Sequence, residues 1–273
     1  MICFDAHVHI HTLFSIDGML AEARHNFTRQ LPKDAGDRPA AFVLLLAEAD
    51  GCDFFSGLKE TADRDRYTTP GGWRITPTEE AESLLLTRND WPGGRLFILA
   101  GRQLVTAEKI EVLALATPAK FADGLTLDAT VEAVRSHDAL AVLPWGVGKW
   151  LGERGEILDD FLKRAAPEGL FVGDNGGRPF FWPAPRLFRT AAVRGIGLLP
   201  GSDPLPLPAE ESRVGSYGGW LQGEITNDHP ATDLRRRLTD RSHPVVPFGG
   251  RMGARRFLQA QVALRRLTPH KGV

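Results

Sequence analysis

The residues best suited to chemistry stand at the start of the chain, in the segment Asp5-Ala6-His7-Val8-His9-Ile10-His11. The apolar run before them, at residues 2–4, is typical of a buried strand. Because a strand alternates its side chains, His7 and His9 are expected on one side, with His11 next in line if the strand continues. Two neutral imidazoles on one face at a strand end can hold a divalent cation. We therefore predict a metal site at this pair, against the alternative of two histidines that merely alternate.

The order of apolar and amphipathic stretches predicts the fold class. Buried strands are expected at residues 2–4, 40–47, 95–100, 140–143, 169–172 and 196–199, and helices at 128–137, 156–166 and 254–267. Such alternation predicts parallel strands with right-handed crossovers. We predict an α/β fold, with residues 1–273 as a single domain that forms a distorted TIM-like (β/α) barrel of about seven strands. An open doubly wound sheet is the alternative, but no glycine-rich phosphate loop follows the first strand.

Three further segments carry local expectations. Residues 50–77 are polar and are expected to be irregular. Residues 77–89 are expected to form a helix, with Thr78 as its cap and acidic residues in its first turn. The strand at 95–100 and a strand at 111–117 are expected to form a hairpin.

In a barrel of this kind the site lies at the C-terminal ends of the strands, so the polar residues at those ends become candidates. Glu48, Asp174 and Asp203 are carboxylates in such positions. Together with His7 and His9 they form a nitrogen and oxygen ligand set suited to Zn²⁺, Mn²⁺ or Fe²⁺. Asp203 is also a candidate general base. Each carboxylate has a structural alternative: the two aspartates as turn formers, and Glu48 as a helix cap or the partner of a basic residue.

Basic residues near the same strand ends are candidates for contact with substrate. Lys149, Arg178 and Arg102 are expected to meet an anionic group, and Lys149 is also a catalytic candidate. His11 is expected on the substrate side of the histidine pair. The alternative for the cations is a solvated or ion-paired role.

The composition limits which partners and which cellular compartment are expected. The chain has 273 residues, a formal net charge of −1 and two cysteines. The near-zero charge argues against nucleic-acid and membrane partners, and the basic residues at the strand ends favour a small anionic substrate. Two cysteines do not make a disulfide framework, and no run approaches the ~20 apolar residues of a membrane span. We therefore expect a cytoplasmic protein.

The sequence resembles the polymerase-and-histidinol-phosphatase (PHP) family of metal-dependent phosphoesterases. The resemblance is carried by four segments, which run over most of the chain: Asp5 to Gly18, Phe97 to Gln103 with Lys109 to Leu113, Ala141 to Trp145, and Gly201-Ser202-Asp203. It implies a distorted seven-stranded β/α barrel, divalent metal ions and phosphoester hydrolysis. The amidohydrolase superfamily, which also begins Asp-x-His-x-His, is the second choice.

Several ligand positions of the PHP family are replaced in this chain. Glu48 stands where the second motif ends in histidine, Gln103 takes the place of a bridging glutamate, Trp145 lies where a histidine precedes proline, and Leu205 takes the place of the last histidine. His7, His9 and Asp203 remain, which matches one metal position. Two hypotheses follow. The chain is a metal-dependent hydrolase, or it is a catalytically degenerate barrel that acts as a binding or partner module.

Overall fold

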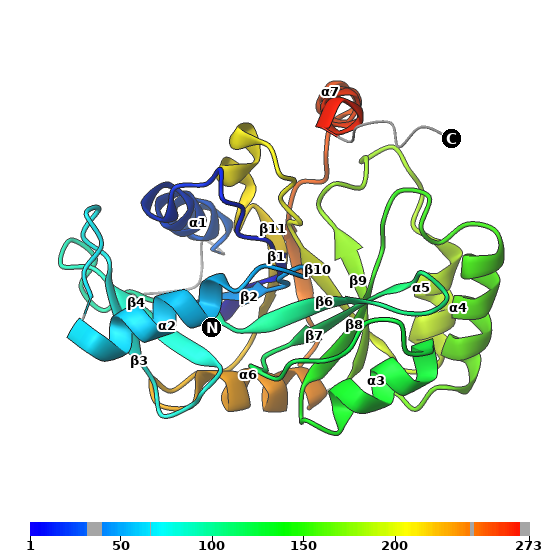
Figure 1. Ribbon diagram of the computed structural model, residues 1–273, viewed down its shortest axis with the longest axis horizontal. Coiled ribbons are helices and arrows are strands. Elements are labelled where there is room, and N and C mark those ends of the chain that lie inside the picture. Colours follow the sequence, from blue (N-terminus) through cyan, green and yellow to red (C-terminus); the bar gives the residue numbers. More distant parts are fainter. Residues whose placement is uncertain (32–39, 66, 241–242, 268–273) are drawn as a thin grey trace.

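The computed structural model describes residues 1–31, 40–65, 67–240 and 243–267, and it shows an α/β protein with two sheets (Figure 1). The strands are β1 (Ile2–Val8), β2 (Ala41–Leu46), β3 (Arg74–Pro77), β4 (Ser83–Thr87), β5 (Arg95–Leu99), β6 (Gly101–Val105), β7 (Glu111–Leu115), β8 (Leu140–Pro144), β9 (Leu170–Asn175), β10 (Gly197–Gly201), β11 (Tyr217–Leu221) and β12 (Val246–Gly249). The helices are α1 (Ile16–Gln30), α2 (Phe54–Asp65), α3 (Leu127–Arg135), α4 (Glu153–Arg164), α5 (Arg186–Val193), the 3₁₀ helix η1 (Pro208–Arg213), α6 (Pro230–Thr239) and α7 (Ala254–Leu267).

Each sheet has a parallel part extended by antiparallel strands. The seven-stranded sheet has the order β12-β11-β1-β2-β5-β4-β3, in which β1, β2 and β5 are parallel. The five-stranded sheet has the order β10-β9-β8-β7-β6, in which β8, β9 and β10 are parallel. The hairpin was expected between the strands at 95–100 and 111–117, but β5 pairs with β2 and β4 in the seven-stranded sheet, and the antiparallel partner of β7 is β6.

The two sheets enclose one apolar interior. Phe4 of β1 and Phe97 of β5 belong to the same buried cluster as Val142 of β8 and Leu199 of β10. Leu234 of α6 joins this cluster, and α6 lies across the lower end of the strands in Figure 1. The parallel strands finish at the opposite end, which is where a functional site is expected in a fold of this kind.

The sheets also approach each other at two edges. Beside β2, the backbone of Glu48 receives a hydrogen bond from Gln103 at 2.9 Å and donates one to Gly101 at 3.1 Å. Beside β1, the nitrogen of Asp203 donates to the oxygen of His7 at 2.8 Å. The α/β class is confirmed. In the described residues, however, the paired strands form two sheets and no continuous closed ring, so the seven-stranded barrel is not established.

Helices cover the outer faces of both sheets (Figure 1). Phe27 of α1 and Phe55 of α2 pack with the outward residues of β1 and β2. Val131 of α3, Leu158 of α4 and Leu187 of α5 pack against the five-stranded sheet. These apolar stripes account for the helices, because burial of one face stabilises an amphipathic helix.

Two local expectations were wrong. Residues 77–89 hold the turn into β4 in place of a helix, because Leu84 and Leu86 are buried by pairing with β5. Glu80 of that turn accepts hydrogen bonds from the nitrogens of Ala231 at 2.7 Å and Thr232 at 2.8 Å, and so caps α6 instead. Residues 50–77 are not irregular throughout, since they contain α2 and β3.

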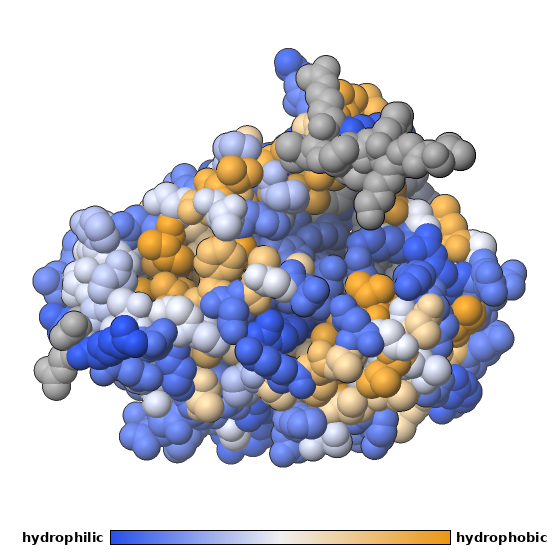
Figure 2. Space-filling view, in the orientation of Figure 1, coloured by the Kyte–Doolittle hydropathy of each residue, from blue (hydrophilic) through white to orange (hydrophobic). Residues whose placement is uncertain are grey.

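In the described part of the chain, no helix is both long and apolar enough to cross a membrane. Figure 2 shows apolar patches scattered among hydrophilic surface on one face of the molecule, with a hollow below α7.

Candidate metal centre

Three side chains from the two sheets converge at the strand ends. His7 lies on β1, His9 follows that strand, and Asp203 follows β10. The Nε2 atoms of His7 and His9 are 3.0 Å apart, and they lie 3.6 and 3.4 Å from Oδ1 of Asp203. One ligand atom of each lies within 4.8 Å of the other two, and no other such group occurs in the residues that the structure describes. Two imidazole nitrogens and a carboxylate oxygen are a donor set that suits a divalent metal such as Zn²⁺.

A close approach of backbones delivers Asp203 to the histidines. A Cβ at Gly201 would overlap the backbone nitrogen of His7, so β10 reaches β1 only because that residue is glycine. Asp203 itself has a φ of +47°, in the left-handed region that aspartate tolerates better than most residues. The hydrogen bond from its nitrogen to the oxygen of His7 holds this conformation. The turn-forming role considered for Asp203 and its place beside the histidines are therefore compatible.

Asp5 braces the centre from inside the protein. Its side chain is fully buried, and Oδ1 accepts hydrogen bonds from the nitrogens of Ser202 at 2.8 Å and His7 at 3.2 Å. Its Oδ2 accepts from the nitrogen of Gly215 at 2.9 Å. Burial raises the pKa of Asp5 to about 6, although these hydrogen bonds oppose the rise. One carboxylate thus ties β1 to β10 and to the segment before β11.

His7 and Asp203 have the protonation states that a metal requires. Burial lowers the pKa of His7 to about 4, so its imidazole is neutral at neutral pH. Burial opposes ionisation of Asp203, but the neighbouring His7 and His9 outweigh it and hold the pKa of that carboxyl well below its usual range. A neutral imidazole and an ionised carboxylate are the forms that coordinate cations.

The lowered pKa of His7 predicts an acid-sensitive stability in the metal-free protein. The unfolded chain binds a proton at this imidazole near pH 6.5, and the folded chain only near pH 4. The contribution of His7 to the free energy of unfolding is therefore complete above pH 6.5. About 3 kcal/mol of that free energy is lost as the pH falls toward 4. Urea unfolding of chelator-treated protein should show a smaller acid loss over this window in His7→Gln than in the parent. An equal loss in both would contradict it.

Asn175 and Lys149 stand beside the three residues. The amide Nδ2 of the buried Asn175 donates to Oδ2 of Asp203 and, at 3.3 Å, to the oxygen of Trp145. Lys149 donates to the carboxylate of Glu111, which also accepts from Nε2 of Gln103 at 3.3 Å. The positive charge of Lys149 helps to lower the pKa values of His7 and Asp203, which places it on the same side. Asn175 and Glu111 were not predicted as site residues, because the only signal in the sequence was that each stands at an end of a strand.

Glu48 lies at its expected strand end, where its carboxylate caps a helix. Its Oε1 accepts hydrogen bonds from the nitrogens of Phe54 at 2.6 Å and Phe55 at 3.0 Å, at the start of α2. The described geometry does not bring it into the group of three ligands. The helix-cap alternative fits these contacts, and it depends on α2, which the sequence did not predict.

A Glu48→Ala substitution separates the two roles. Loss of the cap should lower the free energy of unfolding by about 1 kcal/mol, because two backbone donors of α2 lose their acceptor. Metal content, measured by mass spectrometry on the same preparation, should equal that of the parent. A Glu48→Ala protein that folds but contains no metal would instead make Glu48 a ligand.

Asp174 and Arg178 form a buried ion pair. The guanidinium donates to both carboxylate oxygens of Asp174, at 2.8 and 2.7 Å, and to the oxygen of Trp182 at 3.1 Å. Tyr217 donates its hydroxyl to Asp174 at 2.7 Å. Asp174 is therefore outside the group of three, and Arg178, a residue that is only 4% exposed, has its guanidinium engaged by protein partners.

The two remaining substrate candidates also have partners within the chain. Arg102 pairs with Asp53 at 3.2 Å and donates to the oxygen of Cys52 at 3.1 Å. His11 lies 5.8 Å from His9, ring centroid to ring centroid, and its Nε2 is 2.9 Å from the oxygen of Pro204. His11 thus borders the metal ligands, whereas Arg102 is held at the start of α2.

No family model and no curated protein matches the sequence. Among solved structures, the chain is similar to PsfC from Pseudomonas syringae PB-5123, with 17% identity and a TM-score of 0.58 over 97% of this chain and 98% of that one. It is also similar to PfuEndoQ, a lesion-specific endonuclease from Pyrococcus furiosus, with 13% identity and a TM-score of 0.51 over 99% of this chain and 67% of that one. A complex of Endonuclease Q with a 27-mer duplex substrate, with an abasic lesion at the active site, matches at 12% identity and a TM-score of 0.48, over 99% and 68%.

These similarities concern the fold, which extends over nearly the whole chain. They correct one expectation. The expectation of a small anionic substrate with no nucleic-acid partner was wrong in excluding nucleic acid, because PfuEndoQ, an endonuclease, is similar to this chain in fold. Net charge describes the whole molecule and does not reveal how basic residues are distributed over its surface.

Proposed function

We propose that this protein is a metal-dependent hydrolase of phosphoesters, with one divalent metal held by His7, His9 and Asp203. The observation that carries the proposal is the convergence of these three side chains at the end of the strands, with His7 neutral and Asp203 ionised. A bound divalent metal would polarise a phosphoryl oxygen and lower the pKa of a water molecule. The similarity of fold to an endonuclease supports a phosphoester as the bond that is cleaved.

The surrounding residues have separate tasks in this proposal. Asn175 keeps Asp203 oriented through its hydrogen bond to Oδ2, so that Oδ1 faces the two histidines. Asp5 fixes the backbone on which His7 stands. Lys149, whose side chain is 44% exposed, reaches from the segment after β8 and offers a positive charge to the phosphoryl oxygens.

The second candidate is a binding module without catalysis. It is favoured by the amide of Gln103, which donates to Glu111 at a position where the PHP family has a metal-bridging carboxylate. With one set of ligands in place, the protein would then retain an ion without turnover.

A phosphoester panel with added Mn²⁺ or Zn²⁺ distinguishes the two. The panel should contain a phosphomonoester, a phosphodiester and an oligonucleotide, each tested with the parent and with His9→Ala. The hydrolase proposal predicts metal-dependent turnover of at least one compound by the parent and none by the variant. Absence of turnover across the panel, in protein shown to contain metal, would leave the binding module.

A further inference from the structure

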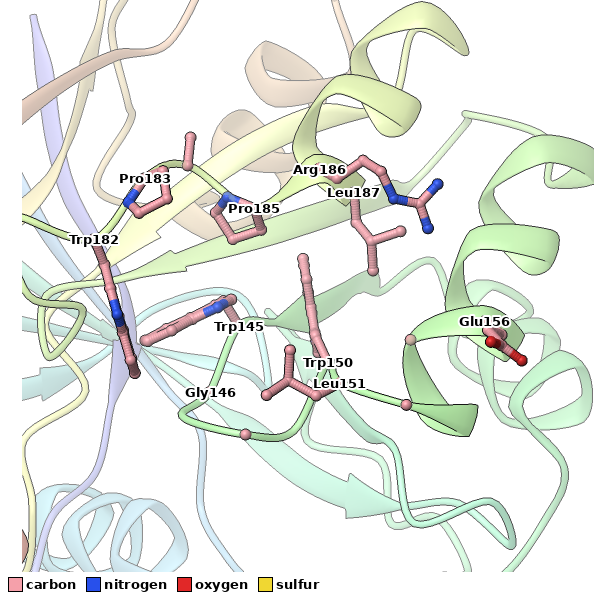
Figure 3. Close-up of a pocket in the computed structure, with 14 residues that line it drawn as sticks. Trp145, Gly146, Trp150, Leu151, Glu156, Trp182, Pro183, Pro185, Arg186 and Leu187 are labelled. Carbon is pink, nitrogen blue, oxygen red and sulfur yellow. The ribbon is translucent and has the colours of Figure 1, made fainter.

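An aromatic pocket opens beside the metal centre. Its volume is about 560 Å³, within the range of small-molecule sites, and it lies between the segment after β8, the start of α4 and the segment before α5 (Figure 3). Three indole rings border it, those of Trp145, Trp150 and Trp182. Pro183 and Pro185 close one side, and the one carboxylate of its lining, that of Glu156, lies far from the tryptophans in Figure 3.

The rings are held in place before any ligand arrives. Trp145 and Trp182 meet edge to face, with centroids 5.8 Å apart and planes at 80°. Trp150 meets Phe188 in the same manner, at 5.6 Å and 85°. Trp182 is 38% exposed, so part of its indole is open to solvent. Fixed aromatic faces around a cavity favour a planar ring as the occupant, because stacking then costs little side-chain entropy.

Hydrogen bonds of Asn175 link the pocket wall to the metal centre. One amide nitrogen, Nδ2 of Asn175, is hydrogen-bonded both to the oxygen of Trp145 in the pocket wall and to Asp203. Lys149 comes from the same segment as the pocket-lining residues Gly146 and Trp150, and its side chain packs along Gly146. A ring in the pocket and a phosphoester at the metal centre can therefore belong to one ligand.

Two exposed aromatic residues precede the pocket-lining Trp182 in sequence, in a segment that contacts α7. Phe180 and Phe181 are 61% and 53% exposed and directly precede Trp182. The nitrogen of Phe180 donates to the oxygen of Met252 at 3.1 Å, and the ring of Trp182 lies 5.6 Å from that of Phe257 on α7. The aromatic segment is thus attached to α7.

The chain around α7 is basic. Arg255, Arg256 and Arg265 are exposed on this helix, and Arg251 precedes it. Arg256 pairs with Glu210 of η1 at 3.1 Å. The sequence has no aspartate or glutamate after Asp240, so this region is positive although the whole chain has a net charge of −1. Basic surface interleaved with exposed aromatic rings is the combination that binds single-stranded nucleic acid.

We propose that the tryptophan pocket stacks one unpaired base of a single-stranded nucleic acid, while the flanking backbone runs along the arginines of α7. This inference rests on the proposed function, because it names the substrate class of the same site. In this arrangement the pocket binds the base and the metal centre binds the adjacent phosphodiester. The arginines of α7 neutralise the charge of the remaining strand.

The test is binding by the full chain after removal of metal with a chelator, so that no hydrolysis is needed. Fluorescence anisotropy compares a labelled 15-residue oligothymidylate with a phosphodiester chain of equal length that lacks bases, using unlabelled thymidine 5′-monophosphate as a competitor. The parent should bind the oligothymidylate at least about fivefold more tightly than the base-free chain, since stacking adds about that much or more per base. Millimolar monophosphate should displace it only weakly.

Variants locate the contact. Trp182→Ala should weaken binding of oligothymidylate about 5- to 100-fold and leave the base-free chain unaffected, whereas Trp182→Phe should stay close to the parent. Val193→Ala, an exposed apolar residue of α5, serves as the matched control and should change nothing. Equal affinity for the two chains, no binding of either, or full displacement by low monophosphate would overturn the proposal. The comparison of oligothymidylate with the base-free phosphodiester, made with the parent protein, tests the proposal even if Trp182→Ala fails to fold.

The two proposals can fail separately. If the parent binds oligothymidylate through its bases but hydrolyses no phosphoester when metal is restored, the proposed function fails and the pocket assignment stands. If the parent hydrolyses phosphoesters but binds oligothymidylate no more tightly than the base-free chain, the pocket assignment fails and the proposed function stands.

Discussion

Asp203→Asn is expected to remove phosphoester hydrolysis and metal together. Asparagine has nearly the same shape and tolerates the left-handed φ of +47° at this position, so the fold should remain. The substitution removes the only carboxylate among the three converging side chains. Because Asp203 is the anionic member of the ligand set, the loss should exceed the about 10- to 100-fold typical of removing a residue outside the first ligand sphere. Initial rates at saturating metal, and metal content by mass spectrometry, measure it.

Asp53→Asn provides the matched control. Asp53 is an aspartate outside the metal centre that directly precedes α2 and pairs with Arg102. It should retain activity and metal. Asp203→Asn protein that keeps both would remove this carboxylate from the centre and contradict the assignment.

Asp5→Ala is expected to cause the largest loss of stability. It would leave three backbone N–H groups, those of His7, Ser202 and Gly215, without their acceptor in the interior. A stranded buried donor costs about 1–3 kcal/mol, so the free energy of unfolding should fall by more than about 3 kcal/mol in total. Urea denaturation followed by circular dichroism measures this loss.

Asp5→Asn gives a graded comparison. The amide keeps one oxygen, which can still accept from the nitrogens of His7 and Ser202, but it has no second acceptor for Gly215. Its cost should therefore be smaller than that of alanine. Equal stability of the parent and Asp5→Ala would show that this carboxylate does not join the two sheets.

The histidine pair and Asp203 were predictable because local signals position them. Alternation along a strand places His7 and His9 together, and a strand end followed by Gly-Ser-Asp places Asp203 at the same edge. The α/β class followed from the alternation of apolar strands with amphipathic helices. The arrangement into two sheets did not follow, because pairing at the edges depends on contacts between distant residues.

The roles of the other strand-end residues depend on partners that are remote in sequence. Asp174 accepts from Tyr217, which lies 43 positions later, and Glu48 caps a helix that the polar sequence of residues 54–65 did not reveal. Strand-end position identified both residues without indicating whether they would coordinate metal. The basic region of α7 was hidden for a similar reason, since a net charge of −1 averages it with acidic surface elsewhere.

Metal content of the purified protein, measured beside a His7→Ala/His9→Ala double variant, tests the metal centre most directly. The structure predicts about one equivalent of a divalent transition metal in the parent and none in the variant, with both proteins folded by circular dichroism. No metal in the parent, even after soaking with Zn²⁺ or Mn²⁺, would contradict the account and leave the two histidines with a structural role.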